Sequence, residues 1–165
     1  MYKRQVVKTF DLSQTDGKEL PTIGPSELVG NIEGYPKLLQ ALQEISPVPV
    51  SFELIDGDAK GFYHLEDKKI VVQDGMSEVQ TIKTLLHEMA HQKLHDKDNV
   101  PEAKDISRNG KEVEAESVAY VVCQHYGINT SDYSFSYVAG WSEGKETPEL
   151  KASLDKIRQT ASEFI

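Results

Sequence analysis

A long amphipathic helix, predicted from the cap at Ser77 to about His95, is the feature that most constrains how this chain can fold. Ser77 is a favoured N-cap residue, and Glu78 suits the positive end of the first turn. Apolar side chains recur at helical spacing along one broad face, at Val79, Ile82, Leu85, Leu86, Met89, Ala90 and Leu94. A face of this width is buried in a folded domain, so we expect other elements to pack against it.

The segments before this helix are typical of a small sheet. Residues 50–55, 61–65 and 69–73 have strand-like patterns separated by turn signals. We expect a small antiparallel sheet of three or four strands, with residues 69–73 as an edge strand along which a peptide could pair. Further upstream, residues 5–10 resemble a short strand, and residues 26–45 an interrupted helix that begins at the cap Ser26.

Helices dominate the rest of the chain. We expect a second helix at about residues 111–126, ended by Gly127, and a short helix within residues 132–141. A last helix opens at residues 147–149 with a cap, a first-turn proline and a first-turn acid. Strands followed by helices predict an α+β domain and not an alternating α/β fold.

Length and composition favour a single domain over residues 1–165, in which residues 1–25 carry the weakest pattern. Cys123 is the one cysteine and lies in an apolar run, so we interpret it as a buried small side chain. The lack of disulfides favours a reducing, cytoplasmic compartment. No targeting segment or membrane span is expected. A net charge of −9 gives no general attraction for phosphate backbones, so we expect no direct nucleic-acid binding.

The amphipathic helix carries a metal-hydrolase motif, His87-Glu88-Met89-Ala90-His91. On a helix His87 and His91 lie about 40° apart around the axis and one turn apart along it, so both imidazoles can reach one metal ion. Glu88 lies about 100° from His87, so it can reach a metal-bound water without binding the metal. Zinc lowers the pKa of such a water, and a carboxylate beside it can take the proton. The motif therefore predicts Zn²⁺ at His87 and His91, with Glu88 as the catalytic base.

A catalytic zinc needs a third protein ligand, and the second predicted helix supplies candidates. Glu112 and Glu116 lie four residues apart on one helix face, while Glu114 is expected on the opposite side. We assign Glu112 as the ligand and Glu116 as the acceptor that holds a ligand histidine, with the reverse assignment as the alternative. Acids also favour the first turn of a helix, which is the competing explanation of this pair.

Other polar side chains have weaker claims on the site. His95 lies one turn after His91, but a histidine at the end of a helix is explained by the helix dipole. Tyr120, Tyr126 and Tyr137 each carry a hydroxyl that could donate to a tetrahedral oxyanion, and we keep Tyr137 as the candidate. Packing at the edge of the core is the competing explanation for each tyrosine.

Three stretches of the sequence resemble a known family. Residues 85–91 and 112–119 resemble the motif helices of the ImmA/IrrE-like zinc metallopeptidases. Within that group, the stretch Phe135-Ser136-Tyr137-Val138-Ala139-Gly140-Trp141 resembles the Ser-Tyr-Ile-Ala-x-Trp element of the ArdC-type antirestriction and LtrC-like proteins. Residues 150–165 also resemble the last helix of that group, so the resemblance covers roughly residues 60–165.

This resemblance implies a zincin-like fold, in which the histidine-bearing helix lies beneath a small sheet and a second helix supplies the third ligand. It implies zinc at His87, His91 and Glu112, with Glu88 as the general base. Related peptidases carry Asp or Asn where this chain has Glu116, so this position departs from the family pattern. Such domains are encoded by plasmids, conjugative transposons and phages, and are often joined to a DNA-binding domain in a longer protein.

Three functions are consistent with these observations. The first is a zinc-dependent metallopeptidase domain of a mobile genetic element, acting on a peptide or protein substrate. The second is a non-catalytic antirestriction or protein-binding module with a structural or vestigial zinc site, although a structural site has no need of Glu88. The third is a helical interaction domain in which the motif is accidental.

Overall fold

The computed structural model describes residues 28–131, 134 and 147–165. The strand expected at residues 5–10, the cap at Ser26 and the candidate Tyr137 with the rest of its element lie outside these residues. Within them the elements are α1 (Tyr35–Ile45), β1 (Val50–Glu53), β2 (Gly61–His64), β3 (Lys69–Gln73), α2 (Glu78–His95), the 3-10 helix η2 (Pro101–Lys104), α3 (Arg108–His125) and α5 (Thr147–Phe164). The predicted α+β class is confirmed.

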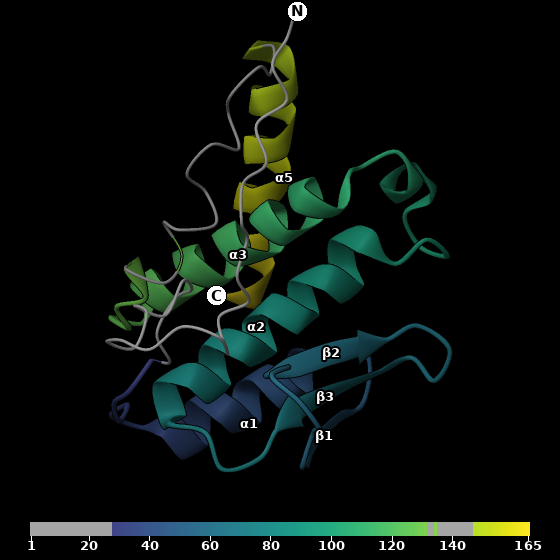
Figure 1. The fold of residues 1–165 in the computed structure, drawn as a ribbon. Helices are drawn as coiled ribbons and strands as arrows, with labels where there is room; N and C mark the ends of the chain where they lie inside the picture. The colour runs from purple at the N-terminus through teal and green to yellow at the C-terminus, as the bar shows by residue number, and fades with distance from the viewer. Residues whose placement is uncertain (1–27, 132–133, 135–146) are drawn as a thin grey trace, which may run out of the picture.

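Helix α2 runs through the middle of the molecule, with the sheet on one side and α3 on the other (Figure 1). Its N-cap is Ser77, as predicted, whose side chain accepts a hydrogen bond from the backbone N–H of Gln80. The apolar face of α2 lies in one core with side chains of β3, α3 and α5. Helix α3 lies between α2 and α5, so more than one of its faces is buried.

The sheet is mixed, which contradicts the antiparallel sheet expected from the sequence. Strand β3 is central, paired parallel with β1 and antiparallel with β2. The loop at residues 54–60 crosses the end of β3, so that β1 and β2 lie on its two sides. A strand pattern does not encode the direction of pairing, which this loop decides.

The prediction that residues 69–73 form an edge strand is also wrong, because β1 and β2 pair with the two sides of β3. The run Ile70-Val71-Val72 is buried throughout, which is typical of a central strand covered on both faces. Strands β1 and β2 form the edges of the sheet in the described part of the chain.

Helix α3 begins at Arg108, three residues before the predicted start at Lys111. The cap is Ser107, whose hydroxyl accepts from the backbone N–H of Gly110. Glu112 therefore lies in the second turn, and the first turn of α3 has no acidic side chain. The preference of acids for a first turn consequently does not explain Glu112 and Glu116. The predicted C-terminal stop is confirmed, because Gly127 adopts a positive φ of 72°.

Two further expectations concern the core. Cys123 is buried as predicted, and burial raises the pKa of its thiol to about 12. The predicted apolar stripe of α5 is only partly buried: Ile157 and Ala161 reach the core, whereas Leu154 is 57% exposed. No helix within the described residues is both long and apolar enough to span a bilayer.

Candidate metal centre

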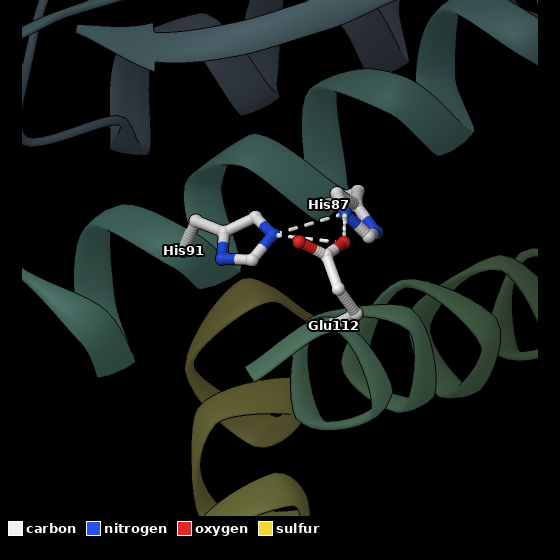
Figure 2. Close-up of side chains that lie close together, drawn as sticks. All are labelled: His87, His91 and Glu112. Atoms are coloured by element: carbon white, nitrogen blue, oxygen red, sulfur yellow. Dashed lines mark hydrogen bonds and ion pairs between the residues drawn. The ribbon is translucent and has the colours of Figure 1, made fainter. Parts of the chain in front are cut away.

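His87 and His91 lie one turn apart on α2 and direct their rings towards α3 (Figure 2). Their Nε2 atoms are 3.0 Å apart. The four-residue spacing predicted that both rings can approach one point, and the structure places them in this way.

Glu112 reaches the same point from the second turn of α3 (Figure 2). Its Oε2 atom lies 3.4 Å from Nε2 of His87 and 3.6 Å from Nε2 of His91. Atoms bound to a tetrahedral zinc at about 2.0–2.1 Å lie about 3.3 Å from one another. The two histidines and Glu112 thus have the spacing of ligands that share one ion, and their ligand atoms all lie within 4.8 Å of each other.

Glu116 faces the other side of His87, where it is fully buried. Its Oε2 atom accepts hydrogen bonds from Nδ1 of His87 at 3.1 Å and from Nζ of Lys83 at 2.6 Å. Its Oε1 atom accepts from the hydroxyl of Ser134 at 2.6 Å. Burial opposes ionisation, but His87 and Lys83 together lower the pKa of Glu116 to about 2. The geometry therefore favours Glu112 as the ligand and Glu116 as the support, and both roles stay predictions.

The sequence interpretation missed Lys83 and Ser134. Lys83 is buried and lies one turn before His87 on α2, so its charge is matched to Glu116 inside the protein. A lysine on the apolar face of the helix, four residues before the first histidine, was an available signal. Ser134 had no local signal, because its contact with Glu116 joins two distant parts of the chain.

His95 was misjudged from the sequence, and its contact with Glu114 was not foreseen. Nδ1 of His95 lies 2.9 Å from Nδ1 of His91, and Nε2 of His95 lies 3.0 Å from Oε2 of Glu114. Both side chains are buried, so His95 is more than a dipole-stabilising residue at a helix end. The helical wheel separated Glu114 from Glu112 and Glu116 but did not predict its partner, because α3 is packed against both α2 and α5.

These contacts set the tautomers of the two candidate ligands. Glu116 accepts from Nδ1–H of His87, which leaves the lone pair of His87 on Nε2. Glu114 accepts from Nε2–H of His95, so Nδ1 of a neutral His95 is the acceptor for Nδ1–H of His91. The lone pair of His91 is then also on Nε2. Two nitrogen lone pairs and the carboxylate of Glu112 converge on one point, which only a cation can stabilise.

The pKa of His87 also indicates that positive charge is favoured between these carboxylates. Burial lowers its pKa, but hydrogen bonds to Glu112 and Glu116 outweigh burial and raise it to about 9. Hydrogen bonds from His87 and His91 in turn hold the pKa of Glu112 far below its usual range. Either a proton or a metal ion between these groups satisfies the carboxylates.

Glu88 lies between α2 and β2, beside the histidines. It is buried, and burial raises the pKa of its carboxyl group above the ordinary value. The backbone of Tyr63 in β2 hydrogen-bonds to it. Gly61 permits this close approach, because a Cβ atom there would lie 2.7 Å from Cγ2 of Thr84 and 3.4 Å from Cγ of Glu88.

A cleft of about 650 Å³ opens over these side chains. Its lining includes Gly61, Phe62 and Tyr63 from β2, the motif residues of α2, and the first turns of α3. This volume lies within the range of small-ligand sites, and the candidate ligands are at its base and wall.

Comparison with known proteins leaves the family of this chain open. A protein of Bacillus anthracis, described as uncharacterised, is 33% identical over 175 aligned positions. The alignment covers 94% of this chain and 29% of the relative, so the chain spans less than a third of that protein. No protein-family model and no solved structure matches the chain. The resemblance to the ImmA/IrrE-like peptidases therefore stays a prediction.

Proposed function

We propose that this chain is a zinc-dependent metallopeptidase domain with His87, His91 and Glu112 as the metal ligands. The proposal rests on one observation: the ligand atoms of His87, His91 and Glu112 lie together at a single point beside Glu88, while Nδ1 of each histidine contacts Glu116 or His95. Three protein ligands in an open cleft are typical of a catalytic zinc site, whereas a structural zinc site is closed by four.

Zinc bound there would lower the pKa of a water molecule and polarise a substrate carbonyl. Glu88 would take the proton from the attacking water and pass it to the leaving nitrogen, and its burial beside β2, which raises its pKa above the ordinary value, favours this role. Glu116 and His95 would hold the rings of His87 and His91 in the required tautomers. The role of Tyr137 at the oxyanion stays a prediction.

Strand β2 is the part of the sheet best placed to orient a peptide. It lines the cleft, and in the described part of the chain it pairs with β3 alone, so its second edge is available. An extended peptide could therefore add to β2 by backbone hydrogen bonds and lie across the candidate ligands. This assigns to β2 the function first expected of residues 69–73.

The setting of the domain is also part of the proposal. The relative from Bacillus anthracis is much longer than the matched region, which supports a domain of a larger protein, and the mobile-element origin follows from the family resemblance. A neighbouring DNA-binding domain, a zincin-like fold and a cytoplasmic location are further parts of the proposal that follow from the family resemblance and the lone, buried Cys123.

The decisive test compares the wild-type chain with Glu88→Gln. We expect one zinc per chain in both proteins by elemental analysis, and cleavage of a mixed peptide library by the wild type alone, with a loss of about 100-fold or more in the variant. Glu66→Gln, in the exposed turn after β2, is the matched control and should cleave normally.

Other outcomes distinguish the alternatives. Equal cleavage by Glu88→Gln would refute the proposed base. Bound zinc without cleavage, together with inhibition of a restriction enzyme by both proteins, would favour the non-catalytic antirestriction module. A chain purified without chelator that holds no metal would favour an accidental motif.

A further inference from the structure

We propose that the cleft selects acidic peptides, in which Asp or Glu side chains lie close to the bond that is cleaved. This inference rests on the proposed peptidase function and adds its substrate class. The observation behind it is the charge of the cleft lining outside the metal group and Glu88. That lining contains five cations and one acid: Lys60, Lys83, Lys97, Arg108, Lys111 and Asp58.

Three of these cations lie between the end of α2 and the first turns of α3, and we call them the cationic rim: Lys97, Arg108 and Lys111. Lys97 follows the end of α2, and the other two lie in the first turns of α3, just before the candidate ligand Glu112. Lys60, just before β2, also lines the cleft. A peptide between β2 and α3 would therefore lie beside the positive charge of the rim.

The cationic rim has no internal counter-charge. Lys97 and Arg108 are exposed and Lys111 is partly exposed, and none of the three forms an ion pair within the described residues. Lys83 differs, because its charge is matched to Glu116 in the interior. The rim charges are thus available to a ligand that enters the cleft.

The stability of α3 does not explain Arg108 in the rim. The N-terminal end of a helix favours acids and disfavours cations, yet the first turn of α3 contains Arg108 and no acid. Arg108, which opposes the dipole of α3, is better explained by a negatively charged substrate, whereas Lys97 follows the C-terminal end of α2, where the dipole favours cations.

The rest of the chain narrows the class of that substrate. The net charge of −9 repels a long polyanion such as a nucleic acid, whose charges would extend beyond the cleft. A short acidic peptide places its charges inside the cleft alone. Alternate side chains of an extended peptide point to the same wall, so acids at every second position could face the rim.

Binding is best measured on the zinc-loaded Glu88→Gln chain, which should hold peptides without cleaving them. The probes are short labelled peptides that differ only in carrying Glu, Gln or Lys at alternate positions, followed by fluorescence anisotropy at low and high salt. We expect the Glu peptide to bind about tenfold more tightly than the Gln peptide, the Lys peptide to bind weakest, and the difference to shrink with salt.

The rim variant Lys97→Gln/Arg108→Gln/Lys111→Gln should keep its zinc and lose most of this preference. The control Lys37→Gln/Lys151→Gln/Arg158→Gln removes the same charge from exposed positions of α1 and α5, outside the cleft lining, and should keep the preference. Equal loss in both variants, no preference among peptides, or tighter binding of a DNA oligonucleotide would overturn the inference. If the wild type cleaves peptides without any charge preference, the substrate class is refuted and the peptidase function stands. If the preference depends on the rim but the wild type cleaves no peptide, the peptidase function is refuted and the acidic-peptide site stands.

Discussion

His87 and His91 are held in place by different chemical groups. His87 donates directly to a buried carboxylate, Glu116, whereas His91 contacts a second histidine, His95. Glu112 differs from the supporting residues Glu116 and His95, because its side chain is 36% exposed and lines the cleft. The candidate ligand Glu112 therefore faces the Nε2 atoms of the two histidines, whereas the supporting residues Glu116 and His95 face their Nδ1 atoms.

This separation predicts different effects for two equivalent substitutions. Glu112→Gln replaces a carboxylate ligand by a poor one, so zinc content should fall well below one ion per chain. Glu116→Gln keeps the three ligands and loosens His87, so zinc should still bind, with affinity lowered by about 10- to 100-fold. Zinc affinity is measured by competition with a chromophoric chelator.

Folding has to be monitored in the same experiment, because Glu116→Gln leaves the charge of Lys83 buried without its partner. Circular dichroism of each variant separates a lost ligand from a lost fold, and Asp155→Asn on the exposed face of α5 serves as a surface control. Zinc binding that survives Glu112→Gln and disappears in a folded Glu116→Gln would reverse the two roles.

Among the secondary-structure elements, the contact between β2 and α2 determines where Glu88 lies. Gly61 is at the closest approach, with the side chain of Thr84 against the strand. The positions of the strand, Glu88 and the cleft are thus linked, and a small displacement of β2 would move all three.

We expect Gly61→Ala to lower cleavage while zinc content is unchanged. The added methyl group would lie 2.7 Å from Cγ2 of Thr84 and 3.0 Å from the carbonyl oxygen of Val71, so β2 has to shift away from α2. Overpacking of this kind costs about 1–3 kcal/mol in the free energy of unfolding. Adding Thr84→Ser removes the clashing methyl group and should restore part of the activity. Full activity of Gly61→Ala would show that this contact does not position Glu88.

Asp96 joins the end of α2 to the β2–β3 hairpin. The buried carboxylate accepts hydrogen bonds from the hydroxyl of Tyr63 at 2.8 Å, from Nζ of Lys68 at 3.0 Å and from Nδ2 of Asn99 at 3.0 Å. Burial acts to raise the pKa of Asp96, but these bonds, chiefly that from Lys68, hold it below its ordinary value.

The direction of this shift predicts a pH dependence of stability. A carboxyl group with a lowered pKa stabilises the folded state above its unfolded pKa, and the contribution is lost as pH falls through the folded pKa. Asp96→Asn should therefore lower the free energy of unfolding by about 1–3 kcal/mol at pH 7, and by less below about pH 4. Urea unfolding at both pH values measures this. An equal loss at pH 7 and pH 3 would contradict the role of the charge.

For the molecule as a whole, the candidate site connects the two halves of the core. Its ligands come from α2, which packs on the sheet, and from α3, which packs on α5 (Figure 1). Bound zinc would therefore stabilise the packing of the helices as well as the cleft.

Removal of zinc should consequently lower the melting temperature of the whole domain. A ligand at about 1,000 times its dissociation constant stabilises by about 4 kcal/mol, which for a chain of this size shifts the melting temperature by about 10 °C. Differential scanning calorimetry with and without a chelator measures the shift. A His87→Ala/His91→Ala variant should not respond to the chelator. Identical melting of the wild type in both conditions would argue against a bound metal.

Local patterns were sufficient to predict much of this molecule. The cap at Ser77, the apolar face of α2, the stop at Gly127 and the spacing of His87 and His91 depend on residues within a few positions of each other, so the sequence alone determined them. The four-residue spacing of Glu112 and Glu116 likewise predicted that one face of α3 carries both acids, but their contact with the motif joins two separate helices.

The tertiary structure decided what depends on distant parts of the chain. The parallel pairing of β1 with β3, the contacts of His95 with Glu114, and the support of Glu116 by Lys83 and Ser134 all join separate elements. Residue spacing reports the direction of a side chain around one axis, but not which neighbouring element will meet it. The candidate ligands could thus be named from the sequence, whereas the groups that orient them and the charge of the cleft required the packed fold.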